Sequence, residues 1–188
     1  MPLYTIGHST RSSEELLGLL KAQGIEAIAD VRSYPTSRHC PHFGRDQLAP
    51  FLTEKGIAYI WLGGELGGYR KKTDGLGDSS PNAGWRSASF RIYADYMLSE
   101  RFTAAAAGLI ELAHSVPTAL LCAERHPVRC HRQLISDYFQ CRGWSVIHIL
   151  EPGKTAPHKL TPFAQVKDGV LTYPASPAGD GTPRIPDI

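Results

Sequence analysis

The sequence predicts an α/β fold, in which a single domain has a mostly parallel sheet covered by helices on both faces. Short apolar runs alternate with amphipathic segments of helical period over residues 3–150. Some of these runs are apolar without alternation, which is typical of strands that are buried on both faces. With 188 residues, 42% apolar and 20% charged, the chain can bury one core and carry an appendage.

The first elements form a βαβ unit. Residues 3–6 are β-prone and end at a glycine. Ser12 and Glu15 have capping-box spacing, and Gly24 stands where a helix would end. The apolar run at 25–31 then completes the unit as a buried strand.

A second helix and strand are expected at residues 47–55 and 57–62. Pro50 should limit this helix to its first turn or kink it. Residues 63–88 carry many Gly, Ser, Asp and Lys residues without periodicity, over a length that exceeds ordinary loops. We expect a lid or a partly disordered loop there.

The second half of the predicted core domain repeats the alternation of helices and strands. Helices are predicted at 89–99 and 102–114, and strands at 117–122 and 145–150. A helix between these strands is predicted to open at Pro127 and run to Gly143, with Cys130 and His131 in its first turn.

A proline-rich region follows the predicted core domain of residues 1–150. Residues 151–174 form an expected C-terminal extension, because Asp168-Gly169 between two apolar runs is typical of a β-hairpin. Residues 175–188 are predicted to be a flexible tail.

Composition narrows the classes of function. No window approaches the roughly 18 apolar residues of a membrane span, and the first residues lack the pattern of a secretion signal. We therefore expect a cytoplasmic protein with no membrane partner. The net charge of +2 gives no strong field for a polyanion, and four cysteines are too few for a disulfide scaffold.

Glycine and polar residues follow each of four predicted strands. If those strands are parallel, the residues converge on the sheet edge where ligands bind in doubly wound folds. Loops need such residues for structural reasons too, so only the convergence of all four groups indicates a site. The groups are Gly7-His8-Ser9, Asp30-Val31-Arg32, residues 63–68 and Cys122-Ala123-Glu124.

Residues 121–132 are the segment with the highest density of reactive side chains. They include two thiols, two imidazoles and three guanidinium groups. A helix N-terminus and the neighbouring Arg129 and Arg132 would lower the pKa of Cys130. The alternative is that Cys130 is a small buried residue on an apolar helix face.

These residues lead to our first hypothesis, an enzyme with a cysteine-centred, arginine-rich site for a small anionic or nucleotide-type substrate. Cys122 or Cys130 would be the nucleophile, and Glu124 and His131 would move protons. The residues expected to bind substrate are His8, Ser9, Asp30, Arg32, Arg38, His42, Glu65 and Arg132.

Two alternatives stay open. Cys122, Cys130 and His131 could bind iron or zinc with nearby histidines, although their spacing is unlike known ribbon patterns and adjacent Cys130 and His131 should diverge on a helix. A nucleic-acid-binding module would use the arginine clusters, with aromatic residues that could stack on bases: Tyr34, Phe43, Tyr69 and Trp85. The oligomeric state is open.

The ordered series of motifs resembles the domain of unknown function 488 family over most of residues 3–174. The resemblance implies the fold and the site positions but no activity, because the family has none assigned. A weaker similarity of layout is to rhodanese-like domains, whose reactive cysteine also heads a loop into a helix, although here that loop carries Glu124, Arg125 and Pro127 rather than small residues. The matching motifs are residues 4–10, 30–35, Ser37-Arg38 with Pro41-His42-Phe43, 65–68, Cys122-Ala123-Glu124 and Cys130-His131-Arg132.

Overall fold

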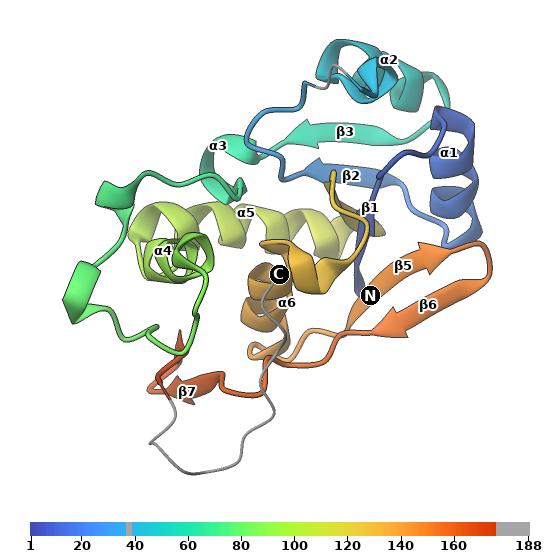
Figure 1. The fold of residues 1–188 in the computed structure, drawn as a ribbon. Coiled ribbons are helices and arrows are strands. Elements are labelled where there is room, and N and C mark those ends of the chain that lie inside the picture. Colours follow the sequence, from blue (N-terminus) through green and yellow to red (C-terminus); the bar gives the residue numbers. More distant parts are fainter. Residues whose placement is uncertain (37–38, 176–188) are drawn as a thin grey trace.

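The computed structural model describes residues 1–36 and 39–175. A central sheet runs through the molecule with strands in the order β3-β2-β4-β1-β5-β6, and β3 and β6 form its two edges (Figure 1). The first five strands are parallel to their neighbours, and β6 is antiparallel to β5. The strands are β1 (Leu3–Gly7), β2 (Ala27–Asp30), β3 (Ala58–Trp61), β4 (Thr118–Cys122), β5 (Val146–Glu151) and β6 (Lys154–Pro157), and a separate hairpin pairs β7 (Gln165–Lys167) with β8 (Val170–Thr172).

Helices cover both faces of the sheet, as predicted. Two separate apolar cores lie on opposite faces, because neighbouring residues of a strand point to opposite sides. Leu120 of β4 belongs to the core formed with α4, α5, α6 and the C-terminal hairpin, whereas Leu121 belongs to the core under α1 and α2. The helices are α1 (Ser13–Ala22), α2 (Arg45–Glu54), α3 (Gly63–Leu66), α4 (Ala88–Tyr96), α5 (Glu100–Ser115) and α6 (Arg132–Gln140).

The local signals at α1 are confirmed. Ser12 and Glu15 form both hydrogen bonds of a capping box, and Gly24 has a φ of 63° after the last turn. Helix α2 runs from Arg45 to Glu54 with Pro50 inside it, so Pro50 does not limit the helix to its first turn.

The helix predicted from Pro127 to Gly143 is wrong at its start. Pro127–Arg129 form one 3-10 turn, Cys130 is extended with φ −140° and ψ 150°, and α6 begins only at Arg132. Cys130 and His131 therefore precede the helix instead of occupying its first turn.

The segment after β3 is more regular than a lid or partly disordered loop. It contains α3 and two 3-10 turns, Lys72–Asp74 and Gly77–Ser79. The carboxylate of buried Asp95 accepts hydrogen bonds from Leu76 N (2.8 Å) and Asn82 Nδ2 (2.7 Å). These bonds tie the segment to α4.

The region after β5 contributes to the main sheet as well as to the predicted hairpin. Strand β6 was not predicted, since it is a four-residue edge strand that ends in a proline. Asp168 and Gly169 both have positive φ, as the predicted hairpin turn requires. The flexible tail predicted for 175–188 lies, beyond residue 175, outside the described residues.

Candidate active site

The carboxyl end of β4 places Cys122 beside β1, where it aligns with Gly7. The two chains stay together beyond the sheet, because His8 N donates to Cys122 O (2.9 Å). A Cβ on Gly7 would lie 1.9 Å from the carbonyl oxygen of Glu124. Only glycine lets the loop after Cys122 lie this close to β1.

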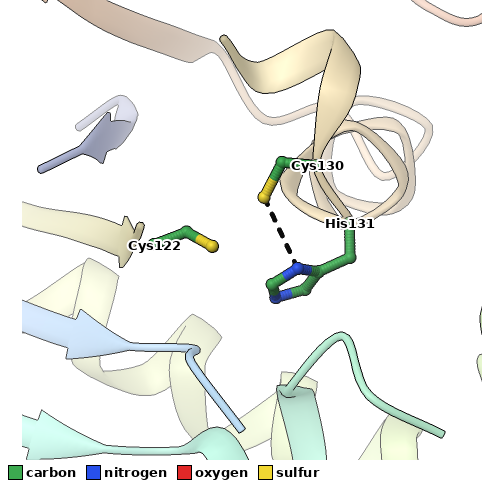
Figure 2. A group of neighbouring side chains, drawn as sticks. All are labelled: Cys122, Cys130 and His131. Carbon is green, nitrogen blue, oxygen red and sulfur yellow. Dashed lines mark hydrogen bonds between the residues drawn. The ribbon is translucent and has the colours of Figure 1, made fainter. Parts of the chain in front are cut away.

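The extended backbone at Cys130 turns its side chain and that of His131 toward the same point. The Cys130 Sγ lies 3.5 Å from His131 Nδ1. The expectation that these adjacent residues diverge was wrong, because it assumed a helix that begins two residues later. Figure 2 shows Cys122 pointing toward this pair from the end of its strand.

The three side chains form a buried cluster that we call the thiol cluster: Cys122, Cys130 and His131. Both sulfurs and a ring nitrogen of His131 lie within 4.8 Å of one another. Cys122 is 8% exposed, Cys130 5% and His131 8%. Three ligand atoms this close are also able to hold one metal ion.

Arg132 supplies positive charge to the Cys130 sulfur. Its backbone N and its Nε donate to Cys130 Sγ at 3.5 and 3.4 Å, and its Nη2 donates to the carbonyl of Glu124. Burial alone would raise the pKa of Cys130, but the hydrogen bond from Cys122 and the Arg132 charge outweigh it and lower the pKa to about 6. The hydrogen bond to Cys130 and burial raise the pKa of Cys122 to about 12. Of the two thiols, Cys130 is therefore the one whose thiolate form is favoured.

The His131 ring has a defined orientation. Its Nε2 lies 3.0 Å from the carbonyl oxygen of Val31, which can only accept, so Nε2 carries a hydrogen. In the neutral ring Nδ1 is then the free nitrogen that faces Cys130. Metal-binding histidines are often held in this way by a backbone carbonyl.

A cavity of about 360 Å³ opens onto the thiol cluster. Its volume lies within the range of small-molecule sites. Arg129 and Glu124 contribute the charged groups of its wall. The lining residues are Gly68, Ser89, Phe90, Tyr93, Cys122, Ala123, Glu124, Arg129, Cys130 and His131.

Comparison with protein families matches residues 12–139 to the model described as Domain of unknown function DUF488. The chain belongs to this family. The match extends from the cap of α1 into α6, so it includes the whole thiol cluster and confirms the resemblance noted in the sequence. Neither the curated proteins nor the solved structures give a match.

A second group of predicted residues in this DUF488 chain forms its own buried network. Arg32 Nε donates to both carboxylate oxygens of Asp30 (2.9 and 3.1 Å), and Arg32 Nη1 contacts the carbonyl of Phe43 (2.8 Å) and His8 Nε2 (3.2 Å). Tyr59 donates to the same carboxylate. Asp30 and Arg32 thus bond to protein groups and fix the Asp30-Val31-Arg32 segment, whose middle carbonyl orients His131.

The remaining predicted binding residues lie at different places in the DUF488 fold. His42 Nε2 contacts the carbonyl of Arg11 (2.9 Å), and Ser9 has a φ of 52° in the turn after β1. Glu65 is partly exposed and pairs with Arg101 at 3.1 Å. Arg38 lies outside the described residues. The substrate-binding role of these side chains stays a prediction.

Gly68 and Tyr93 lie against His131 but were not among the predicted site residues. A Cβ on Gly68 would lie 2.5 Å from His131 Nδ1, so this glycine makes room for the ring. Tyr93 of α4 is 1% exposed, donates to Leu66 O (2.8 Å) and packs edge-on against His131. The glycine run after β3 was a usable signal for Gly68, whereas nothing local in the sequence connects Tyr93 with the cysteines.

Among the described residues, no helix has the length and apolar character needed to cross a membrane.

Proposed function

We propose that this protein is a cysteine-dependent enzyme that acts on a small anionic substrate, with Cys130 as its nucleophile. The observation that carries the proposal is the position of the Cys130 sulfur. It lies just before α6, where it accepts from the backbone N of Arg132 and contacts His131, and it borders a cavity. A thiolate is the reactive form of cysteine, and positive charge and a helix N-terminus both favour it.

The neighbouring groups have complementary roles in this proposal. The Cys122 thiol donates a hydrogen bond to the Cys130 thiolate, and His131 Nδ1 accepts or returns a proton beside it. Glu124 lines the cavity and is the second candidate for proton transfer. Arg129, exposed at the cavity wall, would bind the substrate's negative group.

Alkylation rates measured across pH test the nucleophile. Iodoacetamide should modify Cys130 with an apparent pKa near 6. Cys141 is the internal control, because burial raises its pKa. Residue-resolved mass spectrometry reports both thiols in one sample. If Cys130 is alkylated only at the alkaline pH that Cys141 requires, the proposal is wrong.

A charged probe tests the anionic substrate. Iodoacetate and iodoacetamide react by the same displacement and differ in charge, so their rate ratio at Cys130 reports the local field. We expect the ratio to favour iodoacetate more than it does for Cys141. Arg129→Ala should abolish this preference, and an unchanged ratio in that variant would remove Arg129 from substrate binding.

A second candidate function is a zinc or iron site. It is favoured by one observation, the approach of three ligand atoms to within 4.8 Å of one another. Two thiolates and Nδ1 of a carbonyl-oriented histidine are a suitable donor set, and three protein ligands leave a fourth position for substrate. Elemental analysis of untagged protein decides between the candidates. Stoichiometric metal that protects Cys122 and Cys130 from alkylation supports the metal site, and trace metal with free alkylation contradicts it.

A further inference from the structure

The structure places two thiols against the same cavity, although one would suffice for a simple nucleophile. Cys122 ends β4, Cys130 precedes α6, and both line the cavity wall. Their sulfurs lie within 4.8 Å of each other. Each is buried by the protein except where it meets the cavity.

The other two cysteines have different surroundings. Cys141 follows the last turn of α6, and the Cys40 Sγ lies 3.8 Å from the carbonyl of Ser9. Neither lines the cavity. The pairing of thiols is therefore specific to the wall on which a substrate would rest.

A base is in position for the second thiol as well as for the first. A ring nitrogen of His131 lies within 4.8 Å of both sulfurs, Nδ1 is 3.5 Å from Cys130 Sγ, and Nε2 is fixed by the Val31 carbonyl. Deprotonation of Cys122 needs no rearrangement of the backbone, because the ring already faces the pair (Figure 2).

We propose that the substrate class is a small anionic disulfide and that Cys122 is the resolving thiol, an inference that rests on the proposed role of Cys130. In the first step the Cys130 thiolate attacks one sulfur of the substrate. A bond forms between Cys130 and that sulfur, the substrate disulfide breaks, and the other half leaves as a thiolate that takes up a proton.

In the second step Cys122 gives its proton to His131 Nδ1 and attacks the Cys130 sulfur. The Cys122–Cys130 disulfide forms, the bond from Cys130 to the substrate sulfur breaks, and the second thiolate leaves and is protonated. Two electrons have passed from the protein dithiol to the substrate disulfide. An external thiol reductant returns the protein to the dithiol by the same exchange chemistry.

Dithiobis(nitrobenzoate), an aromatic disulfide with two carboxylates, is the test probe, because each thiolate it releases is coloured. The full chain carrying Cys40→Ser and Cys141→Ser serves as the parent, so that only the proposed pair reacts. A chelator is present throughout. We expect two coloured thiolates per chain, none retained, and a Cys122–Cys130 disulfide in the mass spectrum.

Adding Cys122→Ser to the parent should stop the reaction halfway, with one thiolate released and one retained on Cys130. Cys122→Ala is the second variant in case the serine disturbs packing, and circular dichroism confirms that each variant is folded. If the parent itself retains the probe on Cys130, the resolving role is wrong and the nucleophile stands. If neither thiol of the folded parent reacts, both proposals fail.

Discussion

Two buried clusters of titratable side chains adjoin α6, one just before its first residue and one that includes Asp137 within it. They differ in how their polar atoms are partnered. We call one the histidine network: Thr5, His148, His158, Asp137, Thr161 and Tyr173. When both of its histidine rings are neutral, its hydrogen bonds have one direction. The Asp137 carboxylate accepts from His158 Nε2 (2.7 Å), His158 Nδ1 accepts from His148 Nε2 (3.0 Å), and His148 Nδ1 accepts from Thr5 Oγ1 (2.7 Å).

The carboxylate of the histidine network has no spare capacity. Asp137 also accepts from Thr161 N (3.0 Å), Thr161 Oγ1 (2.6 Å) and Tyr173 OH (2.9 Å). This network joins the segment after β6 to α6 and to the sheet. Its polar side chains are hydrogen-bonded to one another, which is typical of a network that stabilises the fold.

The thiol cluster is built differently from similar residue types. His131 Nε2 is bound to the Val31 carbonyl and Cys130 Sγ accepts from Arg132, while His131 Nδ1 and both sulfurs face each other and the cavity. Burial of a histidine therefore does not distinguish structure from chemistry in this protein. The two roles are distinguished by whether the nitrogen and sulfur atoms of the cluster face a cavity.

Asp137→Asn should have the largest effect on stability. One amide nitrogen would replace an oxygen that accepts, so at least one buried donor would lose its partner, and we expect the free energy of unfolding to fall by about 3 kcal/mol. Urea denaturation measures this. The matched control is Asp168→Asn in the exposed hairpin turn, where asparagine tolerates the positive φ.

The same variant tests the separation of the two clusters. In folded Asp137→Asn protein, alkylation of Cys130 should keep its wild-type pH profile. A stability loss below about 1 kcal/mol, or a shifted alkylation profile, would contradict the description of the histidine network as a separate structural element.

Gly68→Ala should disturb the thiol cluster instead. Its Cβ would lie 2.5 Å from His131 Nδ1, so the ring must shift from its position beside Cys130. We expect a loss of about 2 kcal/mol in the free energy of unfolding and a change in the alkylation profile of Cys130. Gly64→Ala is the control, since its nearest atom is Trp61 Cη2 at 3.8 Å. Equal behaviour of the two variants would show that Gly68 has no role in placing His131.

Much of this fold was accessible from the sequence, because its signals are local. Buried apolar runs marked the parallel strands, and the Ser12–Glu15 capping box and Gly24 marked α1. Strand β6 was missed, since a short edge strand needs only one neighbour and carries little apolar pattern. The strand order was not predictable, because it depends on contacts between distant segments.

The candidate site was partly accessible for the same reason. The position of Cys122 at a strand end and the density of reactive groups around Cys130 and His131 are local signals. Their convergence depends on the extended backbone at Cys130, and the proline at 127 suggested a helix there instead. The histidine network was not predicted at all, because His148 and His158 lie far from Thr5 along the chain.

The buried histidines His148, in the histidine network, and His8, beside Arg32, should contribute to stability over a different pH range from the thiol cluster. Burial lowers the pKa of His148 to about 3 and that of His8 to about 4, against an ordinary value of 6.5. Between the lowered pKa of each histidine and 6.5, the unfolded chain binds more protons than the folded protein does. The contribution of these two histidines to stability is therefore complete above pH 6.5 and falls as the pH is lowered toward 4, by up to about 1.4 kcal/mol per pH unit for each histidine.

Cys130 contributes to stability over a higher pH range. Its pKa is about 6 in the folded protein against an ordinary value of 9.0, so the stability that its thiolate contributes is lost as the pH falls from 9 to 6. Urea denaturation of wild type and Cys130→Ser across pH separates the two contributions. We expect the variant to lose the slope above pH 6.5 and to keep the slope below it. A wild type that is equally stable at pH 6.5 and pH 4.5 would contradict neutral, buried His148 and His8.

Tyr173→Phe should have the smallest effect and is the finest test of whether the histidine network is complete. Burial, reinforced by the Asp137 carboxylate, raises the pKa of Tyr173, so its hydroxyl stays a donor. Removing it leaves the same carboxylate oxygen bound by Thr161 Oγ1, and the ring still packs against Trp85. The expected loss is therefore one hydrogen bond, about 1 kcal/mol.

Tyr93→Phe is the matched variant on the cavity side, since its hydroxyl donates to a single backbone carbonyl at a similar distance, 2.8 Å. Each variant should lose a comparable free energy of unfolding by urea denaturation, and Tyr34→Phe, which is exposed, should lose almost none. If Tyr173→Phe costs nothing while Tyr93→Phe does, the Asp137 carboxylate has more donors than it needs. The network would then tolerate the loss of any one donor, and its stability would come from the paired histidines rather than from completeness.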